Sequence, residues 1–132
     1  MNRVFFLFSF LLFTVAANAQ ILEPAKWATA ASASSANAGD EIELIFNVTI
    51  DKDWYLYSSE FPCEDGPIKT TFNFEPNAGY QLVGGIIAVN PIDKYDDIFE
   101  CDVKIFKKKA QFRQKEAAPF TFPVEVMRWT TP

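Results

Sequence analysis

The stretch EIELIFNVTI, residues Glu41–Ile50, shows the clearest period in the chain. Its even-numbered positions are all apolar, and most of its odd-numbered positions are polar, with Ile45 as the one exception. Side chains at every second position of a β-strand point to the same face. The pattern therefore predicts a strand that packs one face against a hydrophobic core.

Further short strands are predicted around this one, and turn residues separate them. The predicted strands are 54–59, 68–74, 81–89, 101–106 and 119–129. Within the last of these, Phe120, Phe122, Val124 and Val126 alternate. The segments 61–67 and 90–97 are predicted loops, and the Ala- and Ser-rich segment 28–40 is either a flexible linker or a weak edge strand. Because no helical period is visible, the fold class predicted is an all-β antiparallel sandwich.

The first nineteen residues have the pattern of a secretory signal peptide. Arg3 precedes an apolar run over 4–16, and Ala17-Asn18-Ala19 is a small-x-small cleavage pattern. We therefore expect residues 1–19 to be removed on export and residues 20–132 to form a single β-sandwich domain. No cysteine follows the cleavage site, so neither a lipid anchor nor direct insertion in the membrane is expected after cleavage.

Composition excludes several classes of function. The chain has no histidine, which removes His-based acid–base catalysis, triads with a His base and most transition-metal sites. A net charge of −5 argues against a nucleic-acid partner. The acidic residues near Cys101 do not follow the spacing of a calcium loop and are interpreted as a solvated loop. No metal or cofactor is expected.

The basic segment IFKKKAQFRQK, residues 105–115, allows two interpretations. It is typical of a surface for an anionic partner or a membrane. Lysines at a strand end also protect an exposed sheet edge from pairing with another chain. We favour the edge interpretation.

Two cysteines, Cys63 and Cys101, are candidate redox residues. Acidic residues lie beside both of them in the sequence, and negative neighbours disfavour the thiolate that disulfide exchange requires. An exported chain with an even number of cysteines commonly oxidises. We therefore favour a structural disulfide, while a buried free thiol and a reactive redox pair remain as alternatives.

Four phrases in order carry a family resemblance: ILEPAKW (21–27), IELIFNVTIDKDWYLYS (42–58), GPIKTTFNF (66–74) and DDIFECDVKIF (96–106). Together they resemble the N-terminal periplasmic domain of the DsbD thiol:disulfide interchange proteins, which also occurs attached to the membrane regions of cytochrome c biogenesis proteins. The resemblance covers about 21–126.

The resemblance implies an immunoglobulin-like sandwich that passes reducing equivalents between a membrane redox domain and thioredoxin-like periplasmic proteins. In that family a cap with an aspartate and a phenylalanine shields the active cysteine pair, and Asp97 and Phe99 match it here. Tyr55 and Tyr57 lie in a matching aromatic strand, and we group them with the cap as candidate partner-binding residues.

One departure from the family concerns the redox pair. The family carries two nearby cysteines followed by prolines, beyond a strand similar to PFTFPVEVM, whereas here that strand is followed by RWTTP. Cys63 and Cys101 stand elsewhere in the chain. We therefore expect a truncated or frame-shifted product, and whether it acts as an enzyme stays open. The alternatives are a non-catalytic exported accessory module and, more weakly, an adhesion-type sandwich.

Overall fold

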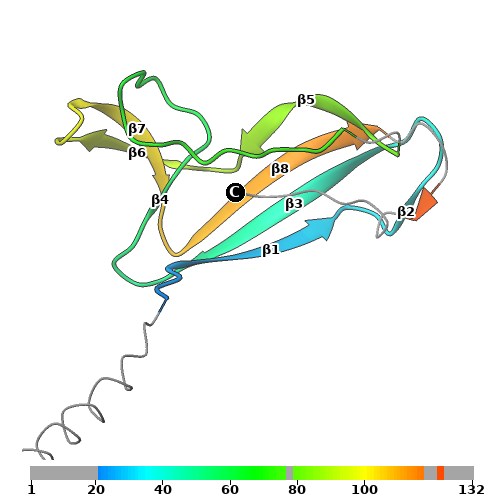
Figure 1. The fold of residues 1–132 in the computed structure, drawn as a ribbon, viewed down its shortest axis with the longest axis horizontal. Coiled ribbons are helices and arrows are strands. Elements are labelled where there is room, and N and C mark those ends of the chain that lie inside the picture. The colour runs from blue at the N-terminus through cyan, green and yellow to red at the C-terminus, as the bar shows by residue number, and fades with distance from the viewer. Residues whose placement is uncertain (1–20, 77–78, 118–121, 124–132) are drawn as a thin grey trace, which may run out of the picture.

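A computed structural model describes residues 21–76 and 79–117, together with the backbone of 122–123 (Figure 1). All regular elements in these ranges are strands, and none of their residues belongs to a helix that is long and apolar enough to cross a bilayer. The strands are β1 (Ala25–Ala31), β2 (Ser35–Ala36), β3 (Glu41–Ile50), β4 (Leu56–Tyr57), β5 (Gln81–Ala88), β6 (Ile92–Asp96), β7 (Cys101–Phe106), β8 (Lys109–Ala117) and β9 (Phe122–Pro123).

The strands form a four-stranded sheet of order β1-β3-β8-β5, a three-stranded sheet of order β4-β7-β6, and the pair β2-β9. All pairings are antiparallel. The β6–β7 hairpin extends from one end of the molecule, away from the larger sheet (Figure 1). The prediction of an all-β antiparallel sandwich is confirmed.

Strand β3 lies inside the larger sheet and supplies much of the core. Its predicted inward face is buried, with Leu44 and Phe46 fully inaccessible to solvent. Phe72, from the segment between the two sheets, packs on Phe46 with ring centroids 4.9 Å apart. The prediction of a strand at 68–74 is wrong, because only one residue of this segment forms a β-bridge. Its aromatic side chains nevertheless enter the core.

Two strands were missed by the sequence patterns. Strand β8 places Ala110, Phe112, Gln114 and Glu116 inward. Because two of these four side chains are polar, the apolar alternation that reveals β3 is absent. The predicted loop 90–97 is wrong, since it contains β6, whose side chains are mostly exposed.

The remaining predictions differ in outcome. The Ala- and Ser-rich segment contains the edge strand β1 and the short β2, so the edge-strand alternative is correct and the linker alternative is not. Strands 81–89 and 101–106 are confirmed as β5 and β7, and 54–59 shortens to β4. For 119–129 only the backbone of β9, which pairs with β2, is described, and most of that prediction lies outside the described residues.

Glu116 is a buried acid in the core. Its side chain is fully inaccessible, and neither carboxylate oxygen has a hydrogen-bond partner within 21–76 and 79–117. Burial raises the pKa of Glu116 from 4.5 to about 7, because the charged form loses its hydration. By contrast, the amide of neighbouring Gln114 donates to the carbonyl oxygens of Gly84 and Lys115.

We therefore expect Glu116 to make the protein less stable as the pH rises from about 4.5 to about 7. In this window the folded protein binds more protons at this site than the unfolded chain, so the free energy of unfolding falls with pH. Glu116→Gln should remove this slope and raise the free energy of unfolding at pH 8 by about 1–3 kcal/mol. Urea unfolding at pH 5 and pH 8 measures both the pH dependence and the change in the free energy of unfolding. The exposed Glu41→Gln is the control, and an unchanged slope in Glu116→Gln would refute the prediction.

Candidate functional site

Cys63 and Cys101 form a disulfide, which confirms the predicted pairing. Their Cα atoms lie 6.0 Å apart. Cys63 belongs to the loop that follows β4 and is buried, whereas Cys101 is the first residue of β7 and is partly exposed. The bond therefore joins this loop to the turn end of the β6–β7 hairpin.

The disulfide is packed on its inner side. Cys63 belongs to a small apolar cluster with Phe61, Val103 and Ile105, all of them buried. The backbone of Gly66 lies against the bond so closely that an added Cβ would overlap the sulfur of Cys63. Only glycine fits at this point of the loop without a shift of the disulfide.

The turn of the β6–β7 hairpin, residues 97–100, contains the two predicted cap residues. The carboxylate that organises this turn belongs to Asp96, the last residue of β6. Its Oδ1 accepts hydrogen bonds from the backbone N–H groups of Ile98 (2.9 Å) and Phe99 (3.2 Å). Its Oδ2 accepts one from the hydroxyl of Tyr57 (2.8 Å).

These contacts shift the titration of both partners. The Tyr57 hydrogen bond and the backbone N–H groups hold the pKa of Asp96 below its ordinary value. Burial, together with the hydrogen bonds to Tyr55 and Asp96, raises the pKa of Tyr57 above its ordinary value. At neutral pH the pair is therefore a carboxylate that accepts a hydrogen bond from a neutral phenol.

Tyr55 extends this network to the surface. Its hydroxyl lies 3.3 Å from that of Tyr57, and the two rings meet edge to face at 5.4 Å. The ammonium group of Lys94, on β6, lies 5.1 Å from the centre of the Tyr55 ring, within the range of a cation–π interaction. The two tyrosines thus contact the β6–β7 hairpin through their side chains.

The structure brings together most of the predicted site residues. Tyr55, Tyr57, Phe99 and the disulfide all border the β6–β7 hairpin, and Phe99 is 42% exposed. Asp97 is exposed in the turn, and within the described part of the chain its side chain has no hydrogen bond or ion pair. Asp96 was missed because 90–97 was predicted as a loop. As a strand, β6 has Asp96 opposite Cys101.

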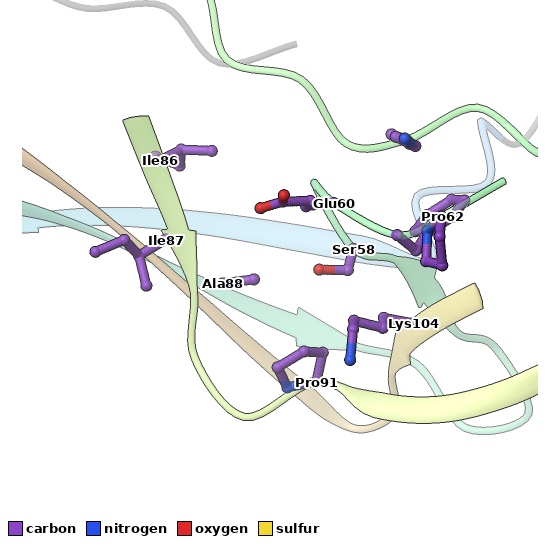
Figure 2. Close-up of a pocket in the computed structure, with 10 residues that line it drawn as sticks. Ser58, Glu60, Pro62, Ile86, Ile87, Ala88, Pro91 and Lys104 are labelled. Carbon is purple, nitrogen blue, oxygen red and sulfur yellow. The ribbon is translucent and has the colours of Figure 1, made fainter. Parts of the chain in front are cut away.

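A groove of about 540 Å³ lies beside the disulfide loop (Figure 2). Phe61 and Pro62, directly before Cys63, line one wall, and Ile86–Ala88 of β5 line the other. The hydroxyl of Ser58 points into this space, is buried, and has no hydrogen-bond partner among the described residues. Glu60, Lys69 and Lys104 add charged groups to the lining, and the ammonium group of Lys104 pairs with Asp93 at 2.7 Å.

Comparison with known proteins gives one family finding. The family described as "Thiol:disulfide interchange protein DsbD, N-terminal" matches residues 19–127. No curated protein and no solved structure matches the chain. The matched span covers well over half of the chain and includes both cysteines and the β6–β7 hairpin.

Proposed function

Because the chain belongs to the family of DsbD N-terminal domains, and is therefore a thiol:disulfide interchange domain of immunoglobulin-like fold, we propose that it docks redox partner proteins at its cap end. The cap end is the turn of the β6–β7 hairpin, residues 97–100, together with Tyr55 and Tyr57. The partners are thioredoxin-like periplasmic proteins or a membrane redox domain. Residues 1–19 act as the export signal, and residues 20–132 form the domain that works in the periplasm.

The observation that carries this proposal is a set of exposed aromatic residues in the turn of the β6–β7 hairpin and beside it. Tyr55 and Phe99 are 40% and 42% exposed, yet the segments that bear them are fixed by the disulfide and by the hydrogen bonds that Asp96 accepts from Tyr57 and from the Phe99 backbone. A rigid aromatic surface loses little conformational entropy when a partner covers it. Aromatic side chains are also enriched among the residues that dominate binding energy.

Two roles are open to the disulfide in this function. In the first it is a crosslink that holds the cap. Four acidic residues adjoin the cysteines in sequence, Glu64, Asp65, Glu100 and Asp102, and oppose thiolate formation. This supports the crosslink role. A domain whose disulfide is only a crosslink would be a non-catalytic accessory module.

In the second role the disulfide itself exchanges with the partner. A partner thiolate would attack one sulfur, form a mixed disulfide with it, and release the other cysteine as a thiolate. The partial exposure of Cys101, two residues from Phe99, favours this candidate. The burial of Cys63 beneath Gly66 counts against it, so the crosslink role is the one we propose.

Removing the Phe99 ring tests docking at the cap. We expect Phe99→Ala to weaken binding of a thioredoxin-like protein roughly 30-fold, as for a central interface residue. The probe is such a protein with its second active-site cysteine replaced, and titration calorimetry measures Kd. Leu82→Ala is the matched control, because Leu82 is also 42% exposed but lies on β5. Equal losses in the two variants, or no binding by the unaltered protein, would refute docking at the cap.

A further inference from the structure

Strand β7 has the disulfide and cap at its start and a pair of lysines at its end. Lys107 and Lys108 form the connection from β7 to β8. The sequence interpretation of these lysines as protection of a sheet edge is wrong, because β8 is an inner strand paired with both β3 and β5. Their position at this end of the sandwich requires another explanation.

The lysines line a cavity of about 500 Å³ together with the turn between β3 and β4. That turn contributes Lys52, Trp54 and Tyr55, and Trp54 is 47% exposed. A large indole ring, three ammonium groups and the carboxylates of Asp51 and Asp53 thus share one surface.

Two further lysines lie at the same end. Lys26 on β1 and Lys109 on β8 are both exposed, and both pair in register with Thr49, next to the last residue of β3. The acidic residues near them are Glu23, Asp51 and Asp53. Five lysines therefore face three carboxylates, in a chain with a net charge of −5.

The first described residues of the chain reach this end as well. The backbone N–H of Asp51 donates to the carbonyl of Pro24 (2.8 Å), which holds residue 24 against the β3–β4 turn. The chain before it carries two exposed apolar side chains, Ile21 (85%) and Leu22 (67%). Figure 1 shows this first segment of the domain beside the β3–β4 and β7–β8 turns. We call the surface formed by Ile21, Leu22, Lys52, Trp54, Lys107 and Lys108 the basic end.

We propose that the basic end docks on the surface of a bilayer that contains anionic lipids. Exposed Trp together with Lys is the composition found at the membrane–water interface, where the ring lies among headgroups and the ammonium groups meet lipid phosphates. Ile21 and Leu22 add apolar area at the same surface. The positive charge of the basic end favours an anionic lipid surface as the occupant.

The acidic residues of the cap oppose this docking little, because they lie far from the lipid. The six residues of β7 separate the cap acids from the β7–β8 turn by roughly 20 Å at about 3.3 Å per residue. Screening reduces charge interactions beyond about 8–10 Å at physiological salt. A lysine within that range strengthens binding to an anionic surface roughly fivefold.

Vesicle sedimentation tests the proposal with residues 20–132, the chain expected after removal of the export signal. We expect more protein to sediment with phosphatidylcholine vesicles that contain phosphatidylglycerol than with phosphatidylcholine alone, and we expect salt to abolish the difference. Lys107→Glu should reduce the phosphatidylglycerol-dependent binding roughly 25-fold, since it removes one favourable charge and adds an unfavourable one. Trp54→Ala should remove the blue shift of tryptophan emission that accompanies binding.

Lys115→Glu is the matched control. Lys115 is exposed on β8, the strand that follows Lys107 and Lys108, but it lies near the opposite end of that strand. It should change binding less than twofold. Equal losses in the two variants, or no dependence on phosphatidylglycerol, would overturn the proposal. Thermal unfolding midpoints show that each variant is folded. Binding of the thioredoxin-like probe without vesicles is a separate measurement, so failure at the membrane is distinguishable from failure of docking at the cap.

Discussion

Replacement of both Cys63 and Cys101 by alanine is expected to lower the free energy of unfolding by about 4 kcal/mol. The bond closes a loop with a sequence separation of 38 residues, and a crosslink of that length restricts the unfolded chain by about this amount in the chain-entropy model. Small domains typically have only about 5–15 kcal/mol of stability, so a large part of it would be lost. Urea unfolding measures the change.

The oxidised and reduced forms of the unaltered protein supply the control. Reduction should destabilise the unaltered protein by a similar amount and should leave the double variant unchanged. A second variant with serine at both positions shows whether a polar side chain in the apolar surroundings of Cys63 lowers the free energy of unfolding further. Equal stability of the oxidised protein and the double variant would contradict the prediction and would remove the crosslink role proposed for this bond.

Phe112→Ala is expected to cost about 3–5 kcal/mol, the range measured for removing a buried aromatic ring. Phe112 is fully buried on β8, and its ring lies 5.0 Å from that of Phe72 and 5.2 Å from that of Phe106. It also stacks on Trp27 of β1 at 6.0 Å. The ring therefore packs against side chains of both sheets and of the segment between them.

Chemical denaturation of Phe112→Ala measures this loss. Phe99→Ala is the control, because the same deletion at a 42% exposed position should cost under about 1 kcal/mol. A loss at Phe112 no larger than that at Phe99 would show that β8 does not anchor the core as the structure indicates.

The sequence predicted those parts of the fold in which one physical effect dominates. In β3 every inward residue is apolar, so alternation alone identifies the strand and its buried face. In β8 the inward face includes Gln114 and Glu116, and burial of such groups depends on partners that only the folded chain supplies. No local pattern distinguishes a strand of this kind from a polar loop.

The candidate site was predicted to a similar extent. Its aromatic members, Tyr55, Tyr57 and Phe99, were grouped from the sequence as candidate cap and partner-binding residues, and in the structure they lie at one hairpin. The carboxylate that organises the hairpin is Asp96 rather than Asp97. Successive residues of a strand face opposite sides, so the choice between two adjacent aspartates requires the register, and the register was fixed only by the pairing of β6 with β7.

The pairing of β3 with β8 has a consequence for how the molecule reaches its native state. Partners in this ladder stand roughly 60 or more positions apart, from Thr49 with Lys109 to Glu41 with Ala117. Pairings this distant give a high contact order, so folding is slow. Until β8 pairs with it, the open edge of β3 is available for pairing with other chains.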